Sequence, residues 1–338
     1  MSKILVTGGA GYIGSHTIVD LIEKGFEVIS LDNYGNSDKE VFDRIKKITG
    51  KTVHNYCVDL TNLHAVDMVF QENTDLVGII HFAALKSVEE STRMPLLYFK
   101  NNITGLLNLL ECTKKYAVKN FIFSSSCSVY GNINTLPVTE ATPFGAAESP
   151  YARTKQMGEQ ILQDFTSNNK QINIIALRYF NPAGAHKSAI IGESPTNKAS
   201  NLVPVITEVA IGKRTSMTVF GSDYDTRDGS CVRDYIHVMD LADAHTKGLE
   251  YLLKETNKAN FEVFNLGSGE GATVLEAIHA FEKANQLKLN YTIGPRRAGD
   301  VIAVYSDNTN ASQSLNWQPR RNIEQIMKTA WEWEKARS

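Results

Sequence analysis

A cluster of glycines near the start of the chain limits the fold more than any other feature of the sequence. Gly8, Gly11 and Gly14 lie between an apolar run at residues 4–7 and a helical pattern at residues 15–24. Glycine suits such a turn because it adopts unusual backbone angles and lets the main chain approach a phosphate closely. The helix that starts there also offers N–H groups and the positive end of its dipole to an anion. The loop therefore predicts a strand–turn–helix unit that binds a dinucleotide.

The residues that follow the loop favour this interpretation over a tight turn without a ligand. Asp32 ends a second apolar run, at residues 28–31, and stands 18 residues beyond Gly14. A carboxylate there accepts hydrogen bonds from an adenosine ribose and repels a 2′-phosphate, so NAD is favoured over NADP. Asp59 follows a third short run, where it either borders the adenine or caps a turn.

Short β-rich runs and longer helical patterns alternate through the first half of the chain. Such alternation predicts βαβ units and a doubly wound parallel sheet of the Rossmann type, with its ligand at the carboxyl ends of the strands. After residue 181 the density of Pro, Gly, Ser and Thr rises, which predicts a smaller α/β domain for the substrate. We expect an NAD-binding domain at residues 1–180 and a substrate domain at residues 181–338, with some later segments returning to the first. Further strands are expected at residues 77–81, 121–124 and 172–177, and helices at residues 102–115, 152–165 and 240–253.

Composition and charge exclude several other classes of protein. Among 338 residues, 35 are basic and 37 acidic, so a net charge of −2 offers no basic surface for nucleic acid. No apolar run approaches the roughly 20 residues of a membrane span. The four cysteines are far apart and the histidines irregularly spaced, so we expect reduced thiols in a cytoplasmic protein and no metal site.

A tyrosine and a lysine one helical turn apart form the second chemical signal. Tyr151 and Lys155 follow Pro150, which suits the first turn of a helix, and so share one helical face. A phenol titrates near pH 10, but an ammonium beside it lowers that pKa. Tyr151 can then take a proton from a sugar hydroxyl as a hydride leaves the same carbon. The same spacing also occurs on helices where the ring is packed and the amine reaches solvent.

Ser124, Ser125 and Ser126 end an apolar run and are the third signal. Ser126 lies at the expected carboxyl end of a strand, where its hydroxyl can bond the reacting oxygen. The alternative is a serine-rich strand cap, and composition does not choose among the three serines.

Beyond these signals, blocks of sequence resemble the extended short-chain dehydrogenase/reductase family, and within it the epimerases that invert C4 of a UDP-hexose. The resemblance extends over nearly the whole chain, and its last three blocks lie outside the cofactor motif. It implies interconversion of UDP-glucose and UDP-galactose by transient oxidation at C4 with bound NAD; activity on the UDP-N-acetylglucosamine/galactosamine pair is a separate hypothesis that depends on Val304. The matching blocks are residues 7–16, 32–37, 81–88, 149–155, 178–182, 232–238 and 295–300.

The resemblance also implies a role for individual residues. Tyr151 would be the acid/base, Lys155 its partner and Ser126 the hydrogen-bonding serine. With these three, the residues that would line NAD are Gly8, Gly11, Tyr12, Ile13, Gly14, Asp32, Asn33, Tyr34, Gly35, Asn36, Ser37, Asp59, Leu60, Phe82, Ala83, Ala84, Leu85, Lys86, Asn101 and Phe180. Those that would hold the UDP-sugar are Lys86, Ser126, Tyr151, Asn181, Asn201, Leu202, Thr218, Val219, Phe220, Arg233, Arg297, Asp300 and Val304.

Val304 stands four residues beyond Asp300, at the position that faces the 2-substituent of the sugar in the resembling enzymes. Valine leaves room for an acetamido group, whereas a shift of one residue would place Tyr305 there instead. The family also implies a homodimer formed through a helix bundle that includes residues 102–115. The apolar stripe of that helix is expected in the core, and consists of Ile103, Leu106, Leu107, Leu109 and Leu110.

Three other functions share the opening chemistry or the fold. A nucleotide-sugar 4,6-dehydratase needs an acid and a base after the strand-end serine, but Cys127 and Ser128 stand there. A non-enzymatic NAD-sensing regulator would be expected to lack the tyrosine or the lysine, and both are present. A dehydrogenase that consumes soluble NAD would be distinguished by whether the purified protein carries its own NAD.

Overall fold

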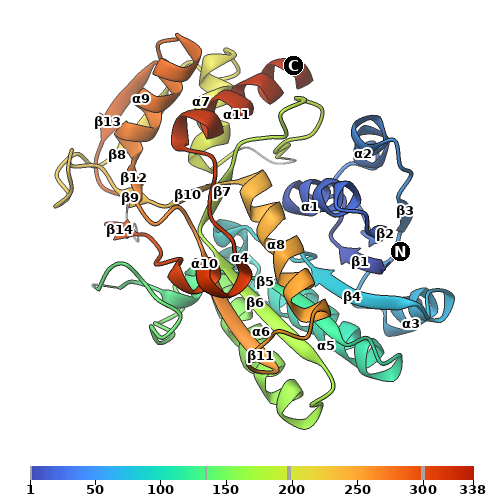
Figure 1. Ribbon diagram of the computed structural model, residues 1–338. Coiled ribbons are helices and arrows are strands. Elements are labelled where there is room, and N and C mark those ends of the chain that lie inside the picture. Colours follow the sequence, from blue (N-terminus) through green and yellow to red (C-terminus); the bar gives the residue numbers. More distant parts are fainter. Residues whose placement is uncertain (1, 134, 196–198, 298–300) are drawn as a thin grey trace. The chain divides into compact units, whose positions relative to one another are not determined.

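The central sheet is parallel where its strand pairs are described, and it has seven strands in the order β11-β6-β5-β4-β1-β2-β3. The computed structural model (Figure 1) describes residues 2–133, 135–195, 199–297 and 301–338. The doubly wound fold class expected from the sequence is confirmed. The strands of this sheet are β1 (Lys3–Thr7), β2 (Glu27–Leu31), β3 (His54–Tyr56), β4 (Leu76–His81), β5 (Asn120–Ser126), β6 (Asn173–Tyr179) and β11 (Phe261–Leu266).

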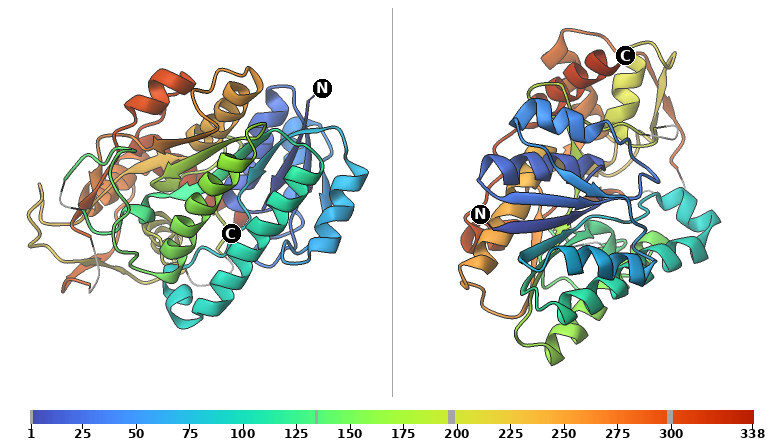
Figure 2. Two further views of the ribbon diagram at one scale, coloured as in Figure 1. Left: turned by 90° about the horizontal axis from the view of Figure 1, so that it is seen from below. Right: turned by 90° about the vertical axis from the view of Figure 1, so that its right-hand side faces the viewer.

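Helices cover both faces of this sheet, as the turned views of Figure 2 show. They are α1 (Tyr12–Glu23), α2 (Val41–Thr49), α3 (Leu63–Glu72), α4 (Val88–Arg93), α5 (Pro95–Lys115), α6 (Pro150–Asn168) and α8 (Val238–Leu253), with a 3₁₀ turn, η1 (Cys127–Tyr130), after β5. Consecutive residues of β5 point to opposite faces: the side chain of Ile122 lies near Gly248 of α8, and the ring of Phe123 near Gly158 of α6. The helices α8 and α6 therefore pack on opposite faces of β5.

The two helices that carry the sequence signals begin in different ways. Gly11 precedes α1 without a side-chain cap, and no acidic residue lies in the first turn. The hydroxyl of Ser149 accepts a hydrogen bond from the N–H of Ala152 at the start of α6, and Pro150 follows the cap. The start of α1 is thus left open to an anion, whereas the start of α6 is capped by its own chain.

One prediction about the core is wrong. Leu106, Leu109 and Leu110 of α5 are buried as expected, but Leu107 is 43% exposed. Leu107 falls on the same helical stripe as Leu96, eleven residues earlier, and that stripe faces away from the sheet.

The chain forms two compact units, which we call unit 1 (Met1–Asn132, Glu140–Arg178 and Ala242–Phe264) and unit 2 (Ile133–Thr139, Tyr179–Leu241 and Asn265–Ser338). Unit 1 contains most of the seven-stranded sheet. In unit 2, apolar residues of three helices and a short strand pack into a separate core. Among the described residues, no helix is both long enough and apolar enough to span a membrane.

Unit 2 holds three small sheets, β10-β7, β12-β9-β14 and β13-β8. Its strands are β7 (Asn181–Ala183), β8 (Met217–Phe220), β9 (Val232–Arg233), β10 (Tyr235–His237), β12 (Ala272–Thr273), β13 (Tyr291–Gly294) and β14 (Ala303–Val304). Its helices are α7 (Leu202–Ala210), α9 (Val274–Asn285), α10 (Thr309–Leu315) and α11 (Ile323–Arg337).

Two helical glycines provide a test of how closely α6 and α8 approach the sheet. A Cβ atom added at Gly158 would lie 2.7 Å from Cζ of Phe123, whereas one added at Gly248 would have its nearest neighbours at 3.6 and 3.7 Å. We expect Gly248→Ala to raise the free energy of unfolding by about 0.5–1 kcal/mol, because alanine favours a helix. Gly158→Ala should lower it by about 1–3 kcal/mol, because the buried ring of Phe123 must move.

Chemical denaturation of the parent and both variants measures the difference. Equal stabilisation by the two alanines would contradict the close approach of α6.

Candidate active site

The glycine loop joins β1 to α1 at the carboxyl edge of the sheet. Gly8 has a φ of +72°, its N–H donates to the carbonyl of Leu31 (2.8 Å), and its carbonyl accepts from Gly11 (3.1 Å). A Cβ at Gly8 would lie 2.7 Å from the N of Ala83, and a Cβ at Gly14 would collide with the carbonyl of Gly8. The loop is therefore a cradle that a side chain would fill, followed by an uncapped helix start at Tyr12 and Ile13. Such an arrangement fits a dinucleotide pyrophosphate.

Asp32 connects this loop to the end of β2. Its Oδ2 accepts from the N–H of Ala10 (3.0 Å), and its Oδ1 accepts from the N–H of Tyr34 (2.8 Å) and the hydroxyl of Ser37 (3.0 Å). Tyr34 has a positive φ of 59°, and burial raises the pKa of its phenol. Asp32 therefore holds the loop of residues 33–37 against the glycine turn. Asn33, Gly35 and Asn36 are exposed in that loop.

The carboxyl end of β4 is held by a hydrogen bond and a ring contact. Oγ1 of Thr7 and Nδ1 of His81 lie 2.7 Å apart, and the ring of Phe82 lies against that of His245. Burial, followed by the charge of Lys155, lowers the pKa of His81 to about 3, so this imidazole is neutral near pH 7.

Asn102 was not identified from the sequence, yet it links three segments. Its Oδ1 accepts from the N–H of Leu85 (2.9 Å), and its Nδ2 donates to the carbonyl of Leu85 (3.0 Å) and to Oγ1 of Thr154 (3.1 Å). Through these bonds it holds the segment of Ala83, Ala84, Leu85 and Lys86 to α5 and α6. Its neighbour Asn101 donates to the same Asn102 oxygen (3.0 Å).

Asp59 lies at the end of the loop after β3. Its Oδ1 accepts from the N–H and the hydroxyl of Thr61, both at 2.8 Å, so this oxygen caps a turn. Leu60, the next residue, is buried against the core on α5. The structure thus shows the turn-capping role that the sequence left open for Asp59.

Tyr151 and Lys155 lie one turn apart on α6, as predicted. The Lys155 ammonium is 5.9 Å from the centre of the Tyr151 ring and 5.0 Å from that of Phe123, and it donates to the carbonyl of Ser124 (2.5 Å). Burial lowers the pKa of Lys155 to about 8, and the charge of Glu159 opposes that fall. The pair thus places a cation beside a phenol at the carboxyl end of β5, where a proton can be exchanged near neutral pH.

The three serines of β5 have different surroundings. The hydroxyl of Ser125 donates to Glu159 in the interior, and the carbonyl of Ser124 receives Lys155. Ser126, at the end of the strand, accepts from the N–H of Ser128 (3.2 Å) and caps η1. The separation of Ser125 from Ser126 follows from the alternation of side chains along a strand.

In unit 2, Arg233 and Val304 are register partners in the parallel pair β9–β14 and so share one face of that sheet. The Arg233 guanidinium donates to the carbonyls of Val232 (2.9 Å) and Val301 (2.7 Å). A Cβ at Gly271 would contact both Val232 and Tyr305, which places these two side chains together on the opposite face. Val304, rather than Tyr305, therefore lies on the face of Arg233.

The other residues expected to hold the sugar nucleotide are spread over unit 2. The backbone N–H and Nδ2 of Asn181 both donate to the carbonyl of Asp234, and Phe180, expected at NAD, is buried beside it. Asn201 precedes α7, which begins at Leu202.

Phe220 is 41% exposed, and the Arg297 guanidinium lies 5.4 Å from the centre of its ring. Thr218 is exposed, but the side chain of Val219 is in the core, so only its main chain can reach a ligand. Asp300 lies outside the described residues.

Asp234, next to Arg233, was also not identified from the sequence. This fully buried carboxylate accepts from the N–H and hydroxyl of Ser268 (both 2.6 Å) and from the N–H (3.0 Å) and hydroxyl (2.7 Å) of Ser306. It thereby connects β9 to the segment after β14. Because the partners are 34 and 72 residues away, no local pattern predicts them.

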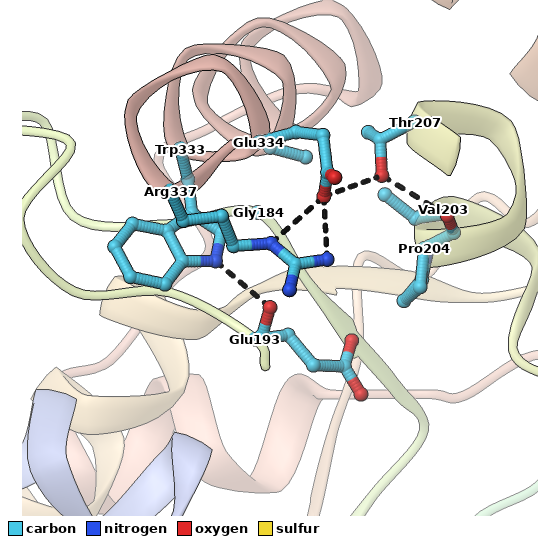
Figure 3. Close-up of a pocket in the computed structure, with 9 residues that line it drawn as sticks. Gly184, Glu193, Val203, Pro204, Thr207, Trp333, Glu334 and Arg337 are labelled. Carbon is cyan, nitrogen blue, oxygen red and sulfur yellow. Dashed lines mark hydrogen bonds and ion pairs between the residues drawn. The ribbon is translucent and has the colours of Figure 1, made fainter. Parts of the chain in front are cut away.

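A small, partly open pocket of about 10 Å³, room for about one water molecule, lies elsewhere in unit 2 (Figure 3). There Glu334 of α11 pairs with Arg337 and Lys213, and Trp333 donates to the carbonyl of Glu193 (2.8 Å). None of the expected site residues lines it, so it is a packing seam between α11 and α7. Across the described ranges, no cluster of His, Cys, Asp and Glu is arranged to hold a metal ion.

The sequence matches a family model described as GDP-mannose 4,6 dehydratase over residues 5–330. It is 47% identical over 331 residues to a UDP-glucose 4-epimerase of Bacillus subtilis (strain 168), covering 98% of this chain and 96% of the relative. It is 48% identical over 335 residues to UDP-glucose 4-epimerase uge1 of Schizosaccharomyces pombe, covering 98% and 93%.

Solved structures of the same family are also similar to this chain. The UDP-glucose 4-epimerase of Stenotrophomonas maltophila with bound NAD and formylated UDP-arabinopyranose has a TM-score of 0.96 at 42% identity, covering 100% of this chain and 99% of that chain. That of Bifidobacterium longum in complex with NAD+ and UDP has a TM-score of 0.93 at 44% identity, covering 99% and 98%. The UDP-Glc/GlcNAc 4-epimerase of Campylobacter jejuni has a TM-score of 0.86 at 38% identity, covering 99% and 100%.

Proposed function

This chain belongs to the UDP-glucose 4-epimerase family, and we propose which of its residues carry out the NAD-dependent interconversion of UDP-glucose and UDP-galactose. The observation that carries the assignment is the position of Lys155, whose buried ammonium lies beside the Tyr151 ring at the carboxyl end of β5. We assign NAD to unit 1 and the UDP moiety to residues of unit 2.

The residues of unit 1 fit NAD. The glycine cradle and the uncapped start of α1 accept the pyrophosphate, and Asp32 accepts a ribose hydroxyl. Bound NAD supplies the acceptor and donor of a hydride at C4 of the sugar. The proposed cofactor site of unit 1 is completed by the loop of residues 33–37, the segment of residues 82–86, Asp59, Leu60 and Asn101.

Tyr151 takes the proton of the 4-hydroxyl and later returns one to the same oxygen. The Lys155 ammonium stabilises the phenolate form of Tyr151, and the hydroxyl of Ser126 donates to the sugar oxygen. Arg233 and Arg297 grip the diphosphate with planar guanidinium groups, and Phe220 contacts the uracil. A 4,6-dehydratase is not favoured, because Cys127 and Ser128 follow Ser126 and neither carries a carboxylate.

The first test removes only the reacting hydroxyl. Tyr151→Phe should lower kcat by about 10²- to 10⁴-fold, because general acid–base catalysis contributes that much, while bound NAD and the KM for UDP-galactose change little. The matched control is Tyr251→Phe on α8, which removes a hydroxyl that donates to Glu262 and is not part of the proposed site. Turnover of Tyr151→Phe within a factor of two of the parent would reject the assignment.

We also propose that the N-acetylated UDP-sugar pair is a substrate. Val304 shares a face with the diphosphate-binding Arg233, and the larger Tyr305 lies on the other face. A valine at this position leaves space at the 2-substituent, whereas a large residue excludes an acetamido group by steric clash. The similar Campylobacter jejuni enzyme, named a UDP-Glc/GlcNAc 4-epimerase, supports the proposal.

Substitutions of Val304 test it through kcat/KM for both sugar pairs. Val304→Tyr should reduce kcat/KM for UDP-N-acetylglucosamine at least about 100-fold, since misplacement by about 1 Å costs that much, and should change that for UDP-glucose little. Val304→Ala, which keeps the space open, should retain both activities. A parent enzyme inert toward UDP-N-acetylglucosamine would refute this substrate assignment.

We propose a cytoplasmic homodimer. All four cysteines are free thiols, which suits a reducing compartment. In unit 1, apolar side chains of α3 and α5 are exposed: Leu63, Met68, Leu96, Leu97 and Leu107. A second copy of the chain would cover this surface, since Leu96 (80% exposed) and Leu107 form one stripe along α5.

Analytical ultracentrifugation tests the dimer. Leu107→Glu should convert it to monomer, because a buried unpaired carboxylate at the interface is costly. Ile293→Glu, the same kind of change at an exposed apolar residue of unit 2, should leave the mass unchanged. A monomeric parent protein would overturn the proposal.

A further inference from the structure

In unit 1, a buried ion pair between Glu159 and Arg178 lies one turn of α6 beyond Lys155. Glu159 of α6 accepts hydrogen bonds from Arg178 of β6, from Nε to both carboxylate oxygens (2.9 and 3.2 Å) and from Nη2 (2.7 Å), and a further one from the hydroxyl of Ser125. The Glu159 side chain is 2% exposed and that of Arg178 is 6% exposed. Nη1 of Arg178 donates to the phenol of Tyr130 (2.9 Å).

Stability alone does not account for such a pair. Desolvation of two charges commonly cancels their attraction, and well-packed apolar residues of the same volume are often as stable or more so. Glu159 is nevertheless fully engaged, with both oxygens bonded to Arg178. Burial disfavours the charge of Arg178, but the hydrogen bonds and the charge of Glu159 outweigh burial and raise the pKa of the guanidinium, so Arg178 stays charged. The pair thus places a fixed negative and a fixed positive charge inside unit 1.

The spacing of residues along α6 places the carboxylate of Glu159 one helical turn from Lys155. Tyr151, Lys155 and Glu159 are four residues apart in turn and occupy one face of the helix. Lys155 therefore lies between the phenol and the carboxylate. Its ammonium is buried, and burial by itself favours the neutral amine. A carboxylate one turn away counteracts that preference, consistent with the direction in which Glu159 moves the pKa of Lys155.

The other elements packed around Lys155 add few charges to this balance. β4 contributes His81, which is neutral near pH 7, and β5 contributes the carbonyl of Ser124. β6 contributes Arg178, and η1 contributes Tyr130, whose phenol oxygen accepts a hydrogen bond from Arg178. The helices α4 and α5 also pack near α6, and their Glu90 and Tyr98 are bonded to each other (2.8 Å) while Asn102 bonds Thr154.

We propose that Glu159 is a positioning residue that keeps Lys155 an ammonium beside Tyr151, and that Arg178 limits the strength of its field. This inference rests on the proposed epimerase function, and it assigns to that function a residue pair that does not touch the substrate. After the loss of one proton from the Tyr151–Lys155 pair, the negative charge of Glu159 shifts the pair toward phenolate and ammonium. Removal of that charge shifts the pair toward phenol and neutral amine, a state in which Tyr151 cannot accept the proton of the sugar.

Charge-removing variants test the pair by the sign of their effects. Glu159→Gln removes a negative charge, so the apparent pKa of the coupled Tyr151–Lys155 pair should fall by roughly one unit. The plateau of kcat should also fall about tenfold, since one unit of pKa difference between the two groups is a tenfold change in their proton distribution. Arg178→Gln removes a positive charge, so the apparent pKa should rise. A merely structural role would move both profiles in the same direction or not at all.

Two readouts are measured on the full-length protein with its bound NAD. The first is the pH dependence of kcat with UDP-galactose. The second is the titration of Tyr151, obtained as the ultraviolet difference between each variant and the same variant carrying Tyr151→Phe. The matched control is Glu250→Gln, which removes a carboxylate from an ion pair with Lys254 on α8 and should shift neither readout.

Opposite shifts in the two single variants support the inference, and shifts of the same sign, or none, overturn it. If a single variant does not fold, the double variant Glu159→Gln/Arg178→Gln, which leaves no unpaired charge, decides. In the double variant both charges are lost, but Glu159 is the one that lies a helical turn from Lys155, so the apparent pKa of the Tyr151–Lys155 pair should still fall, by less than one unit. An unchanged apparent pKa overturns the inference. A parent protein that titrates as expected but does not epimerise UDP-galactose rejects the proposed function instead.

Discussion

The parallel pairing of β1 with both β2 and β4 determines where the chemical groups of unit 1 lie. Parallel strands bring all their carboxyl ends to one edge of the sheet. The glycine turn after β1, Asp32 after β2 and His81 at the end of β4 therefore meet at that edge, although they are far apart in sequence. The N–H of Ala10 on Asp32 and the contact of Thr7 with His81 hold the three strand ends together. Glycine is required at position 8 because the main chain of Ala83, from the neighbouring strand end, leaves no space for a Cβ.

The sequence signals that succeeded are local ones. The glycine loop, the alternation of apolar runs and the Tyr151–Lys155 spacing each depend on residues within about one turn or one strand, and the fold class followed from them. The polar residues that hold these parts in place were missed. Asn102 bonds Thr154 across 52 residues and Asp234 bonds Ser306 across 72, so neither leaves a periodic trace in the sequence. Leu107 was wrongly placed in the core for a related reason: an apolar residue at helical spacing has the same appearance whether it faces the sheet or another surface.

Unit 2 depends on a different kind of interaction. Its small sheets have strands of only two to four residues, which are too short to fix their register by ladder hydrogen bonds alone. The buried carboxylate of Asp234 supplies the missing restraint, because its oxygens collect main-chain and hydroxyl donors from two other segments. A one-residue slip of β14 would exchange Val304 for Tyr305 on the face of Arg233. The width of the proposed sugar site is therefore set by a residue that lies outside it.

The chemistry of an epimerase places a symmetric demand on its acid/base. The same tyrosine must accept a proton in one half of the reaction and return it in the other, so a phenol whose pKa lies far from the working pH would slow one of the two halves. A lysine close by lowers that pKa, but full burial of the lysine would remove the charge on which the effect depends. The carboxylate of Glu159 compensates for burial, and the guanidinium of Arg178 compensates for the carboxylate. In the proposed mechanism, Lys155, Glu159 and Arg178 thus carry alternating charges, and these keep a buried cation beside Tyr151.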